Sequence, residues 1–212
     1  MTIITTQNIL AIFTAIADTI DAEKDRLSEL DGVIGDGDHG VTMDIGFSAV
    51  RQALSGLDAN TAEPSAVFNA AAKSFLNAVG ASSGPLYATA FMRAAAAVKG
   101  KAELDDRAFA DAFVAMAKGV QDRGKAERGD KTMIDAWLPA VDALEAAMGQ
   151  GATIGAALDA AASAAEQGAE ATKTMQASKG RASRLGDRSL GHTDPGAAST
   201  ALIVRAMARA LA

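Results

Sequence analysis

Residues 31–40 read Asp31-Gly-Val-Ile-Gly-Asp36-Gly-Asp38-His39-Gly40 and separate two segments with helical patterns. This stretch places three carboxylates within eight positions. Ionised carboxylates this close repel one another, so a protein either protonates some of them or neutralises them with a cation. Oxygen ligands favour Mg²⁺, Mn²⁺ or Ca²⁺, and Mg²⁺ usually keeps water and phosphate oxygens as its remaining ligands. The stretch therefore predicts a metal site that also receives a phosphate group.

The same stretch does not fit the Ca²⁺-binding loop of an EF-hand. A loop that began at Asp36 would place Gly40 at its fifth position and Phe47 at its twelfth. The twelfth position of an EF-hand requires a glutamate that binds the ion through both carboxylate oxygens. We therefore interpret the three carboxylates as ligands of a metal bound together with phosphate.

Outward from this stretch, apolar residues recur at helical spacing along nearly the whole chain. Ile9, Ile12 and Ile16 form one stripe before it, while Pro64 and the Asp-Pro pair at 194–195 are signals for helix starts. Alternating β-branched residues, which would indicate strands, are absent from the sequence. The pattern predicts an all-α fold of about eight helices, at roughly 9–30, 41–54, 64–79, 85–99, 105–121, 131–148, 153–175 and 195–211.

The chain has 212 residues, of which 49% are hydrophobic, with a net charge of −6 and no cysteine. This length suits one core, and no break in composition or internal repeat divides it, so we expect a single domain over residues 1–212. The acidic balance argues against nucleic acid and anionic membranes as partners. No basic leader precedes the first helix, and charged residues interrupt every apolar stretch, so we expect a cytoplasmic protein.

Glycine and charge gather in four connections, at 31–40, 79–85, 123–133 and 179–196. In an antiparallel array of eight helices, these connections follow the first, third, fifth and seventh helices, so they emerge at the same end. The segment 123–133 is not a P-loop, because Asp130 stands where the lysine is required and no strand precedes it. The convergence of four such loops predicts a binding site on one rim of the array.

The motifs of these connections resemble those of the DhaL family, the nucleotide-binding subunits of bacterial dihydroxyacetone kinases. They are Gly35-Asp36-Gly37-Asp38-His39-Gly40, Gly80-Ala81-Ser82-Ser83-Gly84-Pro85-Leu86, Gly129-Asp130-Lys131-Thr132-Met133, Lys179-Gly180-Arg181-Ala182-Ser183 and Gly191-His192-Thr193-Asp194-Pro195-Gly196. The resemblance covers nearly the whole chain. It implies a closed barrel of eight antiparallel helices with the active site on one rim.

The resemblance also implies ligands and the residues that hold them. Two Mg²⁺ ions are expected on Asp31, Asp36 and Asp38, bridging to the phosphates of ADP or ATP, with Arg181 as a possible stabiliser of phosphate charge. The expected nucleotide contacts are His39, Gly40, Val41, Thr42, Ser82, Ser83, Gly84, Gly124, Thr132, Met133, Arg181, Asp194, Pro195 and Gly196. Met133 would otherwise be interpreted as a core residue.

The activity implied is phosphoryl transfer to dihydroxyacetone, or to a related short ketose, held on a separate DhaK-like subunit. A DhaM-like protein would rephosphorylate bound ADP in the version that depends on the phosphotransferase system, whereas the ATP-dependent version exchanges nucleotide. Three alternatives stay open on the sequence: an ADP-binding regulatory module, a kinase subunit for another small sugar, and a phosphohistidine carrier that uses His39 or His192.

Overall fold

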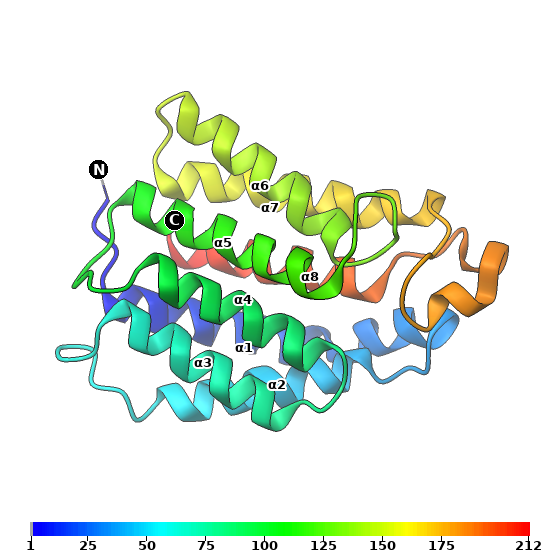
Figure 1. Cartoon of the computed structure of the whole chain (residues 1–212), viewed down its shortest axis with the longest axis horizontal. Coiled ribbons are helices and arrows are strands. Elements are labelled where there is room, and N and C mark those ends of the chain that lie inside the picture. Colours follow the sequence, from blue (N-terminus) through cyan, green and yellow to red (C-terminus); the bar gives the residue numbers. More distant parts are fainter. Residues whose placement is uncertain (1) are drawn as a thin grey trace.

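The computed structural model describes residues 2–212 and consists almost entirely of helices (Figure 1). Within these residues, the one extended pairing is an isolated bridge between Ile4 and Leu104. Two 3₁₀ segments, η1 and η2, lie between the last two α-helices. The elements are α1 Thr6–Ile34, α2 His39–Leu54, α3 Pro64–Ala78, α4 Ser83–Ala97, α5 Asp106–Gly124, α6 Ile134–Gly149, α7 Ile154–Ala171, η1 Thr172–Thr174, η2 Ala182–Ser189 and α8 Pro195–Ala210. The predicted all-α fold is confirmed.

The eight α-helices form a closed ring. Each helix packs against the next one along the chain, and α8 packs against α1, which closes the ring. The helices run lengthwise in Figure 1, and the connections lie at its two ends. The predicted barrel of eight antiparallel helices therefore agrees with the observed packing.

Local signals explain where the helices begin. The side chain of Thr5 accepts a hydrogen bond from the backbone N–H of Asn8, and the Asn8 side chain accepts one from the N–H of Thr5, which forms a capping box at α1. At α8, the side chain of Asp194 accepts a hydrogen bond from the backbone N–H of Ala197. Pro64 and Pro195 occupy first-turn positions, where proline removes no helical hydrogen bond. Both starts predicted from proline are confirmed.

Several helix ends differ from the prediction by a few residues. Helix α1 continues to Ile34, so Asp31 lies in its last turn. Helix α7 ends at Ala171, and its expected extension is the 3₁₀ segment η1. The connection 179–196 contains the 3₁₀ segment η2, which the sequence patterns did not predict. Short 3₁₀ turns lack the apolar periodicity that reveals longer helices, which is why the sequence did not indicate them.

The core changes in character around the ring. Between α1 and α4 it holds edge-to-face and tilted aromatic pairs, with centroids 5.2 to 6.3 Å apart, formed by Phe13, Phe47, Phe68, Phe75, Tyr87 and Phe91. Helix α7 instead buries mainly alanine. At Gly168 of α7, a Cβ atom would overlap the backbone carbonyl oxygen of Asp135 in α6. Small residues thus bring α6 and α7 close together, next to the start of α6.

The four glycine-rich connections lie at the same end of the ring, at the right of Figure 1. The described start of the chain lies at the opposite end, where Ile4 pairs with Leu104 of the α4–α5 connection. The C-terminal segment lies there too, because a Cβ at Gly155 would come within 2.9 Å of the Leu211 carbonyl oxygen. The predicted convergence of the connections on one rim agrees with this arrangement.

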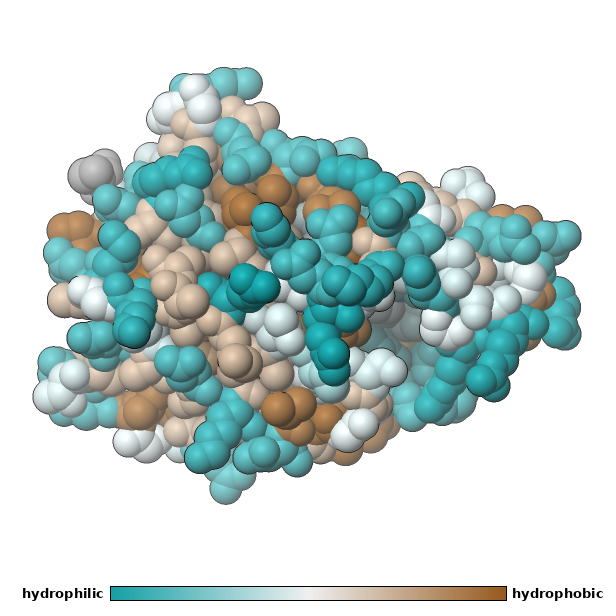
Figure 2. All heavy atoms as spheres, in the orientation of Figure 1, coloured by the Kyte–Doolittle hydropathy of each residue, from teal (hydrophilic) through white to brown (hydrophobic). Residues whose placement is uncertain are grey.

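The surface at that rim is mostly hydrophilic on the face shown in Figure 2, whereas apolar residues are scattered over the helices. Such scattered apolar residues are ordinary on a folded protein surface. None of the helices between residues 2 and 212 is long and apolar enough to cross a membrane.

Candidate metal and phosphate site

The three predicted metal ligands come together in the structure. Asp31, Asp36 and Asp38 each offer a carboxylate oxygen, and these oxygens lie within 4.8 Å of one another. Asp31 is only 9% exposed, whereas Asp36 and Asp38 are exposed on the α1–α2 connection. Below, the three residues are called the acidic cluster. An all-oxygen set with two exposed members fits a hard divalent ion that keeps open positions for water or phosphate.

The turn around the acidic cluster requires glycine. A Cβ at Gly35 would overlap the Asp31 carboxylate, and Gly37 has a φ of +78°, a conformation that side chains disfavour. The backbone N–H groups of Asp38 and His39 donate to Oδ2 of Asp31, at 3.0 and 3.2 Å. The turn therefore holds the Asp31 carboxylate against the N-terminus of α2.

Arg181 supplies a positive charge to the acidic cluster from a different connection. It precedes η2 in the α7–α8 connection, and its guanidinium pairs with the carboxylate of Asp36 and lies 3.7 Å from that of Asp38. These side chains are about half exposed, so the pairs contribute little to folding stability. The predicted site residue Arg181 thus lies beside two of the three carboxylates of the acidic cluster.

The first turn of α2 carries four of the predicted nucleotide residues. His39 Nε2 lies 2.9 Å from the Ser199 hydroxyl oxygen of α8, so the imidazole group links α2 to α8. Burial lowers the pKa of His39, and the charge of Asp31 acts in the opposite direction. Gly40 packs against the carbonyl oxygen of Lys24, so no side chain fits there. Val41 and Thr42 follow in the same turn, whose N-terminus is a favourable place for a phosphate.

The starts of α6 and α8 bring a second group of predicted residues together. A Cβ at Gly196 would lie 3.5 Å from Cβ of Met133 and 3.0 Å from Oδ2 of Asp194. Met133 is 9% exposed and belongs to the hydrophobic core, and Thr132 donates its backbone N–H to Asp135 at 2.8 Å. Pro195 is buried beside them. These residues form one wall at the same rim.

Asp194 belongs to this wall and caps α8. Its carboxylate accepts a hydrogen bond from the N–H of Ala197 at 2.7 Å. Residue 194 keeps part of its surface exposed, but its carboxyl group is enclosed, and this burial raises its pKa to about 7. The charges of Asp135 and Asp31 raise it further, while the hydrogen bond from Ala197 and the charge of Lys131 oppose the shift.

The remaining predicted residues lie at the same end, but no contact links them to the acidic cluster. Ser82 is exposed just before α4, Ser83 begins the helix, and Gly84 packs against the Val79 carbonyl. Gly124 ends α5, where an added Cβ would lie 3.2 Å from Leu86. These positions line a different part of the rim.

The sequence reasoning missed three residues that organise this end. Lys131 is only 1% exposed, and Asp135 is 3% exposed and accepts the backbone N–H groups of Gly129 and Thr132 at 2.6 and 2.8 Å. Buried Thr172 accepts the N–H of Asp194 at 2.9 Å. All three lie in or beside the charged connections, but their burial depends on tertiary contacts that a sequence pattern does not reveal.

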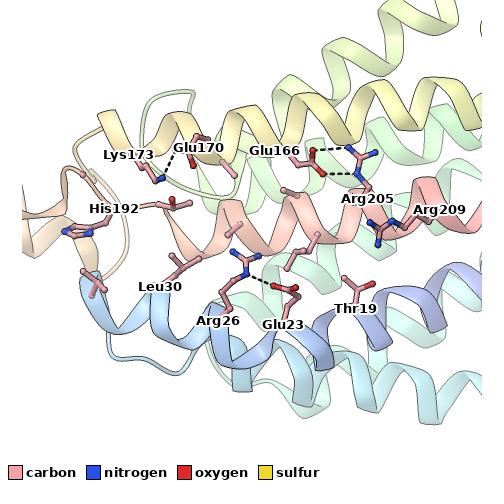
Figure 3. Close-up of a pocket in the computed structure, with 17 residues that line it drawn as sticks. Thr19, Glu23, Arg26, Leu30, Glu166, Glu170, Lys173, His192, Arg205 and Arg209 are labelled. Atoms are coloured by element: carbon pink, nitrogen blue, oxygen red, sulfur yellow. Dashed lines mark hydrogen bonds and ion pairs between the residues drawn. The ribbon is translucent and has the colours of Figure 1, made fainter.

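A large cavity lies elsewhere, along the outside of the ring between α1, α7 and α8 (Figure 3). Its volume is about 620 Å³, and none of the predicted metal or nucleotide residues lines it. Several of its charged side chains pair within it. Arg205 meets Glu166 at 2.8 Å, and Lys173 meets Glu170 at 2.6 Å. This groove is therefore distinct from the acidic cluster.

An antiparallel helical ring with a carboxylate cluster and helix N-termini at one rim defines a class of helical domains suited to bind a metal together with phosphate. The chain belongs to the DAK2 domain family, whose model matches residues 33–209. It is 42% identical over 197 residues to the ADP-binding subunit DhaL of the PEP-dependent dihydroxyacetone kinase of Escherichia coli (strain K12), and 93% of each chain is covered. The resemblance to the DhaL family is confirmed.

Two further relatives support this assignment. The ADP-binding subunit DhaL of PEP-dependent dihydroxyacetone kinase 1 of Listeria innocua serovar 6a is 40% identical over 188 residues, which cover 89% of this chain and 88% of that one. The crystal structure of the C. freundii dihydroxyacetone kinase in complex with AMP-PNP and Mg²⁺ matches with a TM-score of 0.71 at 27% identity. That match covers 94% of this chain and 33% of the longer kinase chain.

The raised pKa of Asp194 leads to a prediction about pH. Between the unfolded pKa near 3.8 and the folded value of about 7, the folded state holds a proton that the unfolded state has lost. Asp194 therefore destabilises the fold increasingly as pH rises through this range. Asp194→Asn keeps a capping oxygen but cannot ionise, so the variant should gain stability relative to wild type as pH rises from 4 to 7. Urea denaturation at several pH values measures this difference.

Asp105→Asn is the matched control for this experiment. Asp105 caps α5 through an equivalent hydrogen bond to the N–H of Ala108, also 2.7 Å long, but it is exposed. Its stability difference from wild type should change much less over the same pH range. If the free energy of unfolding changes with pH in the same way for wild type and Asp194→Asn, the expectation is wrong.

Proposed function

We propose that this chain is the nucleotide-binding subunit of a dihydroxyacetone kinase, with residues 1–212 forming one nucleotide-binding domain. It binds Mg-ADP or Mg-ATP and transfers a phosphoryl group to dihydroxyacetone, or to a related short ketose, on a separate DhaK-like subunit. The observation that carries this proposal is the acidic cluster facing Arg181 at the rim of the helical ring. The curated relatives that the chain matches over most of their length are named ADP-binding subunits DhaL.

Asp31, Asp36 and Asp38 would hold Mg²⁺, for which we propose two ions, as the resemblance to the DhaL family implies. Bound Mg²⁺ supplies neutralisation of phosphate charge. The chain's own groups orient the nucleotide. The first-turn amides of α2 would offer donors to phosphate oxygens, and Arg181 would turn from its carboxylate partners toward the phosphate.

Transfer then depends on positioning and charge, and no covalent intermediate on this chain is needed. His39 is half-buried and lies within hydrogen-bonding distance of Ser199, so it would fix the turn beside the bound nucleotide. We further propose a DhaM-like phosphoryl donor, because both relatives named above are PEP-dependent enzymes. The protein would act in the cytoplasm, where these partners and small phosphorylated substrates are available.

The test of this proposal is nucleotide binding followed by transfer. ADP with Mg²⁺ should bind the purified chain and raise its melting midpoint, whereas ADP with a chelator should do much less. At about 100 times its dissociation constant, the ligand contributes about 2.7 kcal/mol, which corresponds to a shift of about 5–11 °C for a chain of this size. If the melting midpoint is the same with and without Mg-ADP, the proposal is contradicted.

A transfer assay separates this function from its alternatives. Phosphoryl transfer to dihydroxyacetone should require the chain, Mg²⁺, nucleotide and a DhaK-like subunit together. Tight ADP binding with no transfer from any donor to any acceptor would instead favour an ADP-binding regulatory module. Acid-labile phosphate on His39 or His192 in the absence of nucleotide would favour a carrier.

A further inference from the structure

Lys131 lies buried in the α5–α6 connection, and its side chain forms hydrogen bonds with the α7–α8 connection. Its side chain is 1% exposed, and its Nζ atom donates to the carbonyl oxygens of Thr172, Ser189 and His192, at 2.8, 2.7 and 2.6 Å. The three acceptors lie at both ends of the α7–α8 connection. All three ammonium protons are therefore used to fix where this connection leaves the ring and where it returns.

The neighbouring residue holds the middle of the same connection. The Asp130 carboxylate accepts a hydrogen bond from the Ser178 hydroxyl, and its carbonyl oxygen accepts the N–H of Ser178 at 3.2 Å. The N–H of Ala177 also donates to the Ser189 hydroxyl at 3.0 Å. These bonds close the base of an excursion over residues 178–188.

Arg181 lies on this excursion. Residues 182–189 also pack against α1 as η2, but the bonds at the base fix where the chain enters and leaves this segment. The α5–α6 connection thus contributes, together with α1, to the position of the Arg181 guanidinium.

Stability alone does not explain a charged side chain at position 131. An ammonium removed from water is costly unless each proton is bonded, and an apolar side chain of similar volume would often stabilise a core equally well. Burial lowers the pKa of Lys131, while the charge of Asp194 raises it. Unlike an apolar side chain, the ammonium group donates to all three carbonyl oxygens at once, and it thereby holds together segments that are far from residue 131 in the sequence.

We propose that Lys131 is a positioning residue for the nucleotide site: with Asp130, it fastens the 172–192 segment so that Arg181 stands over the acidic cluster. The functional part of this inference rests on the proposed binding of Mg-ADP. The fastening itself does not, so the two are tested separately.

The first experiment measures the fastening without any ligand. Lys131→Met keeps the side-chain length but removes the donor. Limited digestion with trypsin should then cleave the excursion faster by roughly tenfold or more, because lost charged hydrogen bonds make local opening easier. Helix content should stay unchanged in circular dichroism. The expected cleavage sites follow Lys179, Arg181, Arg184 and Arg188.

Lys125→Met is the matched control. Lys125 lies in the same connection and has a similar left-handed backbone, with φ of +52° against +58° for Lys131, but its side chain is exposed. This variant should be digested like wild type. Equal digestion of Lys131→Met and Lys125→Met would overturn the proposal.

The second experiment asks whether Lys131 acts through Arg181. Lys131→Met and Arg181→Met should each weaken Mg-ADP binding, and the double variant should bind within about twofold of Arg181→Met alone. Losses that simply multiply would show that Lys131 does not act through Arg181 and would overturn the positioning role. If wild type itself fails to bind Mg-ADP, the proposed function is wrong, while the digestion experiment still decides the fastening.

A second variant covers the case in which Lys131→Met does not fold. Ser178→Ala removes the hydroxyl that donates to Asp130, at an exposed position where the fold should tolerate it. It should accelerate cleavage of the excursion to a smaller extent than loss of the ammonium. Cleavage at the wild-type rate would contradict the fastening.

Discussion

Asp36→Asn is expected to lower the affinity for Mg²⁺ in the presence of ADP on the order of a hundredfold or more, and to lower phosphoryl transfer in parallel. The substitution keeps the size of the side chain but removes one of three charges from a cluster whose oxygens lie within 4.8 Å. It also removes the pair with Arg181, which is half exposed and contributes little to stability. Helix content and the melting midpoint of the ligand-free protein should therefore change little. Mg²⁺ titrations and a transfer assay measure the effect.

Glu29→Gln is the control for charge alone. Glu29 is exposed on α1, two residues before Asp31, and lies outside the acidic cluster. Removing its charge should leave Mg²⁺ affinity within about twofold of wild type, since exposed charges are screened by solvent and salt. Wild-type transfer by Asp36→Asn at ordinary Mg²⁺ concentrations would show that Asp36 is not a metal ligand.

Gly35→Ala is expected to produce a comparable loss of Mg²⁺ binding without changing any charge. The added Cβ would overlap Oδ1 of Asp31, so either the carboxylate rotates away or the turn shifts. Functional groups tolerate only about 0.5 Å of displacement before a site loses much of its activity. The same Mg²⁺ titration, together with the ADP-dependent melting shift, measures the loss. Gly35→Ala therefore tests the geometry of the cluster, whereas Asp36→Asn tests its charge.

Gly32→Ala is the matched control for this substitution. A Cβ at Gly32 would meet only the Cα of Gly37, at 3.9 Å, which is an ordinary contact. Because Gly32 lies within α1, alanine there should slightly favour the helix. This variant should bind Mg-ADP like wild type. If Gly35→Ala also binds like wild type, the turn does not hold Asp31 as the structure indicates.

Features of the fold that depend on nearby residues could be predicted from the sequence. The stripe of Ile9, Ile12 and Ile16 identified α1, and the prolines at 64 and 195 identified two helix starts, because caps and periodicity are local properties. The placement of the four connections at one end followed from antiparallel alternation. Closure of the ring by α8 against α1 did not follow from these patterns, since it depends on contacts between the two ends of the chain.

The candidate site shows the same division. Asp31, Asp36 and Asp38 lie close in the sequence, so their convergence could be predicted from the motif. The pairing of Arg181 with Asp36 could not be predicted in this way, because the two residues are far apart in the sequence and come together only when α8 packs against α1. Lys131 looked like one charge among several in a solvated connection, and only the carbonyl groups of a distant segment explain its burial.

The position of the chain ends has a practical consequence. Ile4 pairs with Leu104, and the Leu211 carbonyl lies near Gly155, so both ends emerge at the face opposite the acidic cluster. An affinity tag, a fluorescent protein or a surface anchor joined to either end would point away from the rim. Such fusions should leave nucleotide access unhindered, so the chain can be immobilised for binding measurements with its rim facing the solution.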